Sequence, residues 1–169
     1  PVGRLREFPS SASRADIIVV SKCPEILTDE DREQFLMRLQ PEPHQRVYFS
    51  YYKYLPIRPL FTHLPNLKIE DVDKAVLICA IASTDYLMGY LSQYISEINL
   101  LEFEDHHYFT ESDIELCAKH FKTLGQGQNI ILTTEKDATR LHMHEVLIRN
   151  LKLPVYLIPV EVEFHHRDG

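Results

Sequence analysis

The sequence predicts an α/β fold in which a mixed or mostly parallel sheet is flanked by helices in three layers. Apolar runs of strand length alternate with segments whose apolar residues recur at helical spacing. Residues 15–20 form an almost unbroken Ile/Val run, which fits a parallel strand covered on both faces. The chain has 169 residues, of which 44% are hydrophobic and 25% charged, and this composition is typical of a globular domain.

The first strand, residues 15–20, is followed by a predicted helix. Thr28 and Asp31 have the spacing of a capping box, and prolines end the helical pattern after residue 40. The apolar face of this helix is expected to contain Phe35, Leu36 and Leu39. A β-branched and aromatic run at 46–54 predicts a second strand, and the proline-rich loop at 56–66 is the expected hinge.

The remaining chain continues the alternation of strands and helices. Residues 75–82 form the clearest strand, and Ser83 is expected to cap a helix that buries Leu87, Tyr90, Leu91 and Tyr94. A capping pattern at Thr110 predicts a helix that ends at Gly125. Further strands are expected at residues 98–103, 129–133 and 155–164, and a further helix at 145–151.

Composition excludes several classes of protein. The 25 acidic and 18 basic residues give a net charge of −7, which argues against a protein whose main task is to coat nucleic acid. No apolar run approaches the roughly 20 residues that a membrane-spanning helix needs. The three cysteines are far apart and predict neither disulfides nor a zinc site, so a reducing cytosol is expected. Because the chain begins at Pro1, we expect it to be part of something longer.

Two polar clusters follow predicted strands, where ligands bind in open α/β sheets. They are Asp105-His106-His107 and Thr134-Glu135-Lys136-Asp137. A carboxylate beside an imidazole can fix its tautomer and raise its basicity, which suits proton transfer near neutral pH. Consecutive side chains can also face apart, and solvated loops and helix caps produce similar clusters. No third ligand stands at a diagnostic spacing, so no metal site is expected.

Two other segments could bind phosphate or bases. Residues 48–58 mix tyrosines with basic residues, although an exposed strand whose tyrosines cover the core is the preferred explanation. Near the start, Gly3-Arg4-Leu5-Arg6-Glu7 combines a flexible backbone with a planar cation suited to phosphate. The chain contains no G-x-x-x-x-G-K-[ST] phosphate-binding loop.

Four segments together resemble the tetraacyldisaccharide 4′-kinase family, the lipid A 4′-kinases of Gram-negative bacteria. They agree with the family in order and spacing, and they are Gly3-Arg4-Leu5-Arg6-Glu7, RADIIVVSKC at 14–23, FEDHHYFT at 103–110 and TTEKDATRL at 133–141. The last two motifs are the more specific, whereas the first strand could belong to many nucleotide-binding folds.

The resemblance implies that the chain is the C-terminal portion of a P-loop-type kinase. Residues 1–22 would be the tail of the nucleotide-binding domain, 23–45 a connecting helix and linker, and 46–169 the C-terminal α/β domain. The intact enzyme would use ATP and Mg²⁺ to phosphorylate the 4′-hydroxyl of tetraacyldisaccharide 1-phosphate, the lipid A precursor. It would act as a peripheral protein at the cytoplasmic face of the inner membrane. The P-loop domain would lie upstream, so this portion alone is expected to be inactive and to bind no cofactor.

The resemblance also implies roles for individual residues. His106 matches the histidine that the family pairs with a catalytic aspartate, so it would transfer a proton or orient that base. Asp105 would orient His106, while Arg6 and Glu7 match an Arg-Glu pair beside the nucleotide. The motif at 134–137 would either fasten a loop or contact the substrate.

Other interpretations stay open at this point. A non-catalytic α/β nucleotide-sugar or protein-interaction module would use Asp105 and His106 only to cap a helix. An RNA-binding module using residues 48–58 is opposed by the net charge of −7. Residues 80–84 read Ala-Ile-Ala-Ser-Thr where many relatives have Gly-Ile-Ala-x-Pro, which changes the turn chemistry of this segment.

Overall fold

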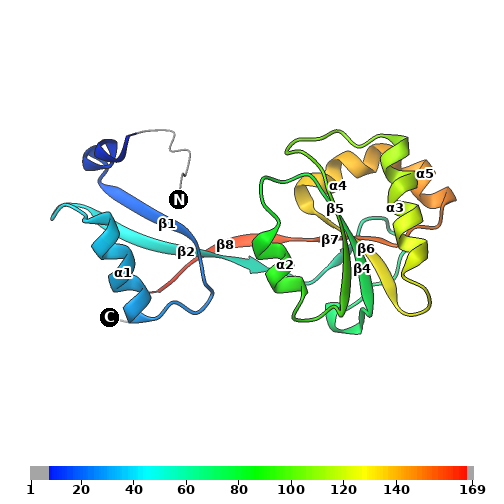
Figure 1. Cartoon of the computed structure of the whole chain (residues 1–169), viewed down its shortest axis with the longest axis horizontal. Helices are drawn as coiled ribbons and strands as arrows, with labels where there is room; N and C mark the ends of the chain where they lie inside the picture. The colour runs from blue at the N-terminus through cyan, green and yellow to red at the C-terminus, as the bar shows by residue number, and fades with distance from the viewer. Residues whose placement is uncertain (1–7, 167–169) are drawn as a thin grey trace. The chain divides into compact units, whose positions relative to one another are not determined.

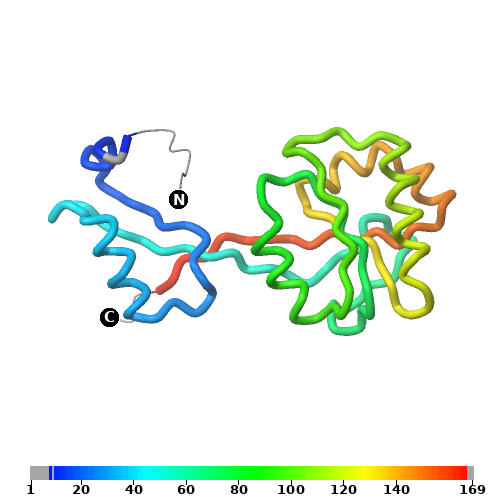
Figure 2. Tube along the Cα trace, viewed as in Figure 1, coloured from blue at the N-terminus to red at the C-terminus, as the bar shows by residue number. Residues whose placement is uncertain are grey.

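The computed structural model describes residues 8–166, which form two compact units (Figure 1). The first unit contains the described residues up to Lys53 and again those from Val160 onward. The second unit is the continuous segment Tyr54–Pro159. The chain therefore passes from one unit to the other twice, as the path in Figure 2 shows.

The first unit is a three-stranded sheet with one α-helix. Its elements are the 3-10 helix η1 (Pro9–Arg14), β1 (Ile17–Cys23), α1 (Asp29–Leu39), β2 (Arg46–Tyr54) and β8 (Val160–Phe164). The strand order is β1-β2-β8, and β1 runs parallel to β2. The predicted capping box is confirmed, because the Thr28 side chain accepts a hydrogen bond from the Asp31 amide and the Asp31 carboxylate accepts one from the Thr28 amide.

The core of the first unit lies between α1 and one face of its sheet. Cys23, Val47 and Phe49 are buried there, and Phe35 and Leu36 of α1 pack against them. The rings of Phe35 and Phe49 have centroids 5.9 Å apart. The predicted apolar face of this helix is thus partly confirmed, although Leu39 is 39% exposed.

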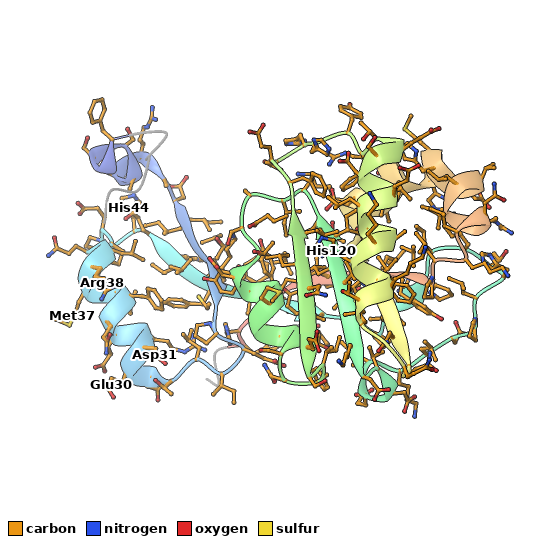
Figure 3. The ribbon with its side chains drawn as sticks, turned by 45° about the vertical axis from the view of Figure 1, so that its right-hand side comes forward. Glu30, Asp31, Met37, Arg38, His44 and His120 are labelled. Atoms are coloured by element: carbon orange, nitrogen blue, oxygen red, sulfur yellow. The ribbon has the colours of Figure 1, made fainter. Side chains whose placement is uncertain are left out.

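The expectation that the first strand is covered on both faces is wrong for the described residues. Ile17 and Val19 of β1 are 57% and 49% exposed. Successive side chains of a strand point to opposite faces, and α1 covers only one face of this small sheet. Figure 3 shows the outward residues of α1, among them Glu30, Met37 and Arg38.

The second unit is a five-stranded sheet with helices. Its elements are β3 (Arg58–Pro59), η2 (Ile69–Asp71), β4 (Lys74–Cys79), α2 (Asp85–Leu91), β5 (Glu97–Glu102), α3 (Glu111–Thr123), β6 (Asn129–Thr134), α4 (Glu135–Leu141), η3 (His142–His144), α5 (Glu145–Asn150) and β7 (Val155–Ile158). The strand order is β3-β7-β6-β4-β5. The four longer strands pair in parallel, and β3 is antiparallel to β7.

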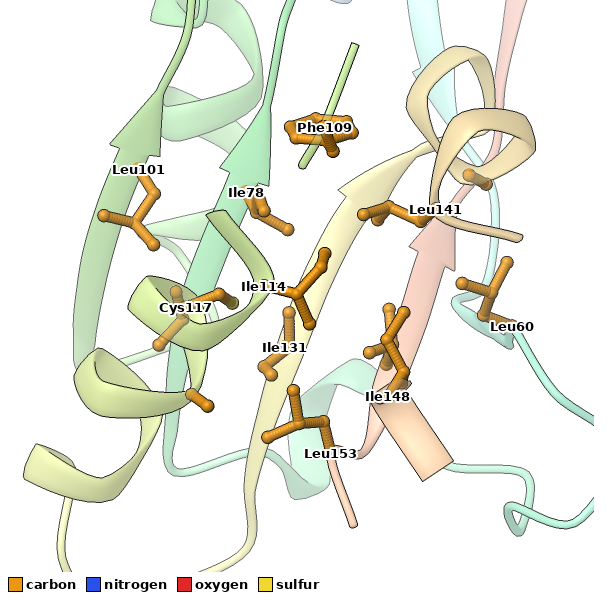
Figure 4. Close-up of a cluster of buried hydrophobic side chains, with 14 of the residues drawn as sticks. Leu60, Ile78, Leu101, Phe109, Ile114, Cys117, Ile131, Leu141, Ile148 and Leu153 are labelled. Carbon is orange, nitrogen blue, oxygen red and sulfur yellow. The ribbon is translucent and has the colours of Figure 1, made fainter. Parts of the chain in front are cut away.

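The central strand β4 shows why this unit has three layers. Val76 and Ile78 point into a core formed with α3, α4 and α5 (Figure 4). Leu77 and Cys79 point to the opposite face, where they pack with residues of α2. Because apolar side chains leave both faces of the strand, helices cover both faces of the sheet. The predicted three-layer α/β fold with a mixed, mostly parallel sheet is confirmed.

The units do not follow the domain boundary expected at residue 46. Strand β2 pairs with β1, so residues 46–53 lie in the first unit together with the segment predicted to precede them. The expected last strand at 155–164 is two strands, β7 and β8, which belong to different sheets. Pro159 separates them, since proline has no amide hydrogen for a strand ladder.

Two smaller expectations also differ from the structure. The proline-rich segment at 56–66 is packed onto the second unit, where Ile57, Leu60 and Phe61 are buried. The N-cap position of α2 is Thr84 and not Ser83, although the Ser83 hydroxyl accepts a hydrogen bond from the Asp85 amide, the first of the helix, at 3.4 Å. The same hydroxyl donates to the carboxylate of Asp85 at 2.9 Å.

No helix within residues 8–166 is long and apolar enough to cross a membrane. The three cysteines are free and buried. Burial raises the pKa of the Cys79 and Cys117 thiols to about 12, because an apolar environment disfavours the thiolate.

We therefore expect Cys79 and Cys117 to be unreactive toward a disulfide reagent at pH 8 in the folded protein, since the thiolate is the nucleophile. Both should react at once in denaturant. A matched control is Lys119→Cys, which places a thiol on the exposed side of α3, the helix that contains Cys117. Reaction of either buried thiol at the rate of this control would contradict the expected burial.

Candidate functional site

The polar residues of interest gather where three parallel strands of the second unit end. Ala80 follows β4, Asp105 and His106 follow β5, and Thr134 is the last residue of β6. The carboxyl ends of neighbouring parallel strands share one edge of a sheet, which is where ligands bind in open α/β folds. The two polar clusters that the sequence placed after strands are therefore brought together at one edge.

The carboxylate of Asp137 is the buried centre of this edge. Asp137 is 0% exposed, although it lies in the first turn of α4. Its Oδ2 accepts hydrogen bonds from the Ala80 amide at 3.0 Å and from the Thr134 hydroxyl at 2.8 Å. The carboxylate thus ties the ends of β4 and β6 to the start of α4.

Arg140 neutralises this buried carboxylate. Its Nη1 lies 3.0 Å from Asp137 Oδ1 and donates also to the carbonyl of His107 at 3.3 Å. The guanidinium carbon lies 5.8 Å from the centre of the Tyr108 ring. A buried carboxylate needs such a paired and hydrogen-bonded cation, because an isolated buried charge is strongly destabilising.

His106 is exposed and has an unusual backbone conformation. Its φ is 68°, in the left-handed region, and its amide donates to the Ala80 carbonyl at 3.4 Å. Its side chain is 71% exposed, with Nε2 lying 3.6 Å from Asp105 Oδ2. The structure therefore sets the predicted Asp105–His106 pair side by side, at a distance longer than a hydrogen bond.

Lys136 holds the other oxygen of Asp105. Its Nζ lies 2.7 Å from Asp105 Oδ1. The hydrogen bond from Lys136 is the main reason that the pKa of Asp105 lies below its usual value, and the neighbouring His106 adds to the effect. A lowered pKa keeps Asp105 ionised at neutral pH, which is the form that can orient an imidazole.

His107 contacts residues beside the site, on α3 and just beyond the end of β5. Its Nε2 lies 2.9 Å from Asp113 Oδ2, and its ring stacks on Phe103 at 4.7 Å. Asp113 also completes the capping box with Thr110 at the start of α3. Partial burial would raise the pKa of Asp113, but hydrogen bonds from His107 and Thr110 outweigh it and lower that pKa.

Within residues 8–166, no group of three or more His, Cys, Asp or Glu side chains is arranged to hold a metal ion. His106 and His107 make separate contacts, His106 with Asp105 and His107 with Asp113.

The residues of the motif at 134–137 make different kinds of contact. Thr134 and Asp137 fasten the loop, because the Thr134 hydroxyl caps α4 by accepting from the Asp137 amide at 3.1 Å. Lys136 contacts Asp105, and Glu135 is exposed in the first turn of α4. Two of the four residues thus make hydrogen bonds within the protein that join the end of β6 to α4, and the role of the whole motif stays a prediction.

Several predicted residues lie elsewhere. Arg6 and Glu7 are outside the described residues. In the tyrosine-rich segment of β2, the Tyr51 hydroxyl donates to Glu163 Oε2 and Lys53 Nζ donates to Glu163 Oε1, both at 2.7 Å. One aromatic and one basic side chain of this segment, Tyr51 and Lys53, are therefore paired with an acidic residue of β8.

Arg140 is the site residue that sequence reasoning missed. It stands in the motif at 133–141, where it follows Asp137 by three residues and Lys136 by four on the predicted helical segment. Residues at these spacings share a helix face. That signal could have grouped Arg140 with the polar cluster, but not with His106, which lies 34 residues earlier.

The fold places this chain among the three-layer α/β proteins, in which ligands bind outside the carboxyl ends of parallel strands. The particular family is clear from the whole sequence: the family model of the tetraacyldisaccharide-1-P 4′-kinases matches residues 1–169. The chain belongs to this family, and the predicted resemblance is confirmed.

Curated relatives of the chain agree with this assignment. A tetraacyldisaccharide 4′-kinase of Phocaeicola vulgatus is 38% identical over 167 residues, covering 97% of this chain and 46% of that protein. One from Bacteroides fragilis is 37% identical over 169 residues, covering 96% of this chain and 45% of that protein. The chain thus spans less than half the length of these relatives and corresponds to their C-terminal portion.

The fold also has a solved counterpart. A crystal structure of LpxK from Aquifex aeolicus in complex with ATP matches with a TM-score of 0.50, at 16% sequence identity. The match covers 97% of this chain and 43% of the other. At this low identity the likeness shows a shared fold.

We expect the Asp137→Ala substitution to lower the free energy of unfolding by about 3 to 5 kcal/mol, because it leaves Arg140 without its buried partner. Chemical denaturation followed by circular dichroism measures this change. The matched control Asp85→Ala removes an exposed carboxylate from the first turn of α2 and should cost about 1 kcal/mol or less. Equal losses for the two variants would show that burial of Asp137 is unimportant.

The Lys136→Met substitution should raise the pKa of Asp105 toward its ordinary value, because it removes the hydrogen bond that is the main cause of the lowered pKa. Carbon-13 NMR of the Asp105 carboxyl during a pH titration measures this shift. Since the folded pKa is lowered, ionised Asp105 stabilises the folded chain at neutral pH, and that contribution is lost as the pH falls through the folded pKa. Lys119→Met on α3 serves as the control, and an Asp105 titration identical in both variants would refute the assigned cause.

Proposed function

We propose that the intact protein to which this chain belongs transfers the γ-phosphate of ATP to the 4′-hydroxyl of tetraacyldisaccharide 1-phosphate. The observation that carries this proposal is the match of the kinase family model to residues 1–169. The Phocaeicola and Bacteroides relatives support it, since each is a tetraacyldisaccharide 4′-kinase. The intact enzyme would act as a peripheral protein at the cytoplasmic face of the bacterial inner membrane.

In this proposal His106 is the catalytic residue of the described chain. Its ring is exposed at the strand ends and lies beside an ionised carboxylate. Its left-handed backbone has a cost on the order of 1–3 kcal/mol, and strained backbone of this kind is concentrated at functional sites. His106 would move a proton from the acceptor hydroxyl, or orient the base that receives it, and Asp105 would orient His106.

The nucleotide and Mg²⁺ would be bound mainly by other parts of the enzyme. The sequence of this chain has no phosphate-binding loop, and residues 8–166 offer no cluster of metal ligands. Arg6 and Glu7 would contribute beside the nucleotide. We therefore propose that the 169 residues alone bind no cofactor, lack kinase activity and depend on a P-loop domain of the same enzyme.

The His106→Ala substitution in the intact enzyme should lower kcat roughly 10²- to 10⁴-fold, as expected for loss of a proton-transfer group. Turnover can be followed as transfer of radiolabelled phosphate from ATP to the lipid acceptor. His120→Ala, on α3 of the same unit, is the matched control and should retain normal turnover. Undiminished turnover of the His106→Ala enzyme would exclude a catalytic role for this residue.

A further inference from the structure

Arg140 is held firmly at one end by the interior of the second unit. Its Nη1 contacts Asp137 Oδ1 at 3.0 Å and the His107 carbonyl at 3.3 Å, and only 15% of its side chain is exposed. The ring of Tyr108 lies 5.8 Å from the guanidinium carbon. A planar guanidinium fixed at one nitrogen and lying near a ring has its other nitrogens fixed in space as well.

The other end of this guanidinium reaches His106. Its Nη2 lies 3.4 Å from Nδ1 of the imidazole. An arginine has only donors, so a hydrogen bond here requires a lone pair on Nδ1. The proton of the neutral ring is then on Nε2, the nitrogen that lies 3.6 Å from Asp105 Oδ2.

Helix α4 supplies the partners on both sides of the imidazole. Arg140 faces Nδ1 directly, while Lys136, one helical turn earlier, holds the Asp105 carboxylate that lies near Nε2. Residues four apart lie on the same face of a helix. The position of α4 thus determines what each ring nitrogen of His106 meets, and Asp137 fixes that position through the ends of β4 and β6.

We propose that Arg140 is a positioning residue that holds the His106 ring in one orientation and keeps its proton on Nε2. The inference rests on the proposed function in one respect, because the value of a fixed ring depends on the role of His106 in proton transfer. A ring that can donate only from Nε2 and accept only at Nδ1 presents a defined face to an incoming group. Proton transfer and base orientation both require such a defined geometry.

Nitrogen-15 NMR of the histidine side chains tests the proposal. The His106 resonances are identified by their absence from the spectrum of the His106→Gln variant. In the wild-type chain, neutral His106 should show a protonated Nε2, an unprotonated Nδ1 that accepts a hydrogen bond, and couplings of a single χ1 rotamer. In Arg140→Met, the Nδ1 resonance should move to that of a free lone pair and the couplings should average. A wild-type proton on Nδ1, or an unchanged spectrum in the variant, overturns the proposal.

Two further variants keep the test decisive. Arg149→Met is the matched control, because Arg149 is a partly exposed arginine that pairs with Glu145 on α5, and it should leave the His106 resonances unchanged. The second variant is Arg140→Lys, which keeps a cation against the buried Asp137. It is used in place of Arg140→Met if the amide spectrum of Arg140→Met shows that the methionine variant is not natively folded. A lysine held at Asp137 is a single ammonium without a second nitrogen for His106, so the same loss of Nδ1 contact is expected.

Kinetics of the intact enzyme separate this proposal from the proposed function. Arg140→Met should lower kcat roughly 10- to 100-fold while KM for ATP stays within about 2-fold, as expected for a misplaced catalytic group. The double variant Arg140→Met/His106→Gln should be no slower than His106→Gln alone, because Arg140 acts through His106. Normal turnover of His106→Gln refutes the catalytic role of His106, whereas an unchanged Nδ1 resonance in Arg140→Met refutes the positioning role alone.

Discussion

The geometry of the site depends on the buried carboxylate of Asp137. It accepts hydrogen bonds from the amide of Ala80, just beyond β4, and from the hydroxyl of Thr134, at the end of β6. It also pairs with Arg140 on α4. The Ala80 amide lies beyond the last residue of its strand, so it would otherwise lack a ladder partner. One side chain therefore completes the hydrogen bonds of two strand ends and fixes the helix that follows them.

His106 is linked to this carboxylate by two routes. Its amide donates to the carbonyl of Ala80, whose own amide donates to Asp137. Its ring nitrogen Nδ1 faces Arg140, which is paired with the same carboxylate. Such a buried polar group adds little net stability when fully paired, but it allows few alternative arrangements. A fixed exposed imidazole is the functional consequence of that restriction.

Local patterns predicted much of the fold, and they placed both polar clusters after strands of the second unit. Capping boxes at Thr28 and Thr110 and the apolar run of β4 were clear in the sequence because each depends on neighbours within a few residues. The division into two units and the exposed face of β1 depend on which distant strands pair, and no local pattern encodes that pairing. The contact of Arg140 with His106 was missed for the same reason, since it joins a helix and a loop that meet only in the folded sheet.

Hydrogen exchange of the Ala80 amide tests most directly whether Asp137 holds the site together. If the carboxylate accepts a hydrogen bond from this amide in a buried environment, the amide exchanges only when the whole unit unfolds. Its exchange is then as slow as that of the amides in the middle of β4. Exchange at the rate of an exposed loop would mean that the carboxylate does not bind the end of β4. Asp137 would then not be the residue that fixes the strand ends, α4 and the imidazole of His106.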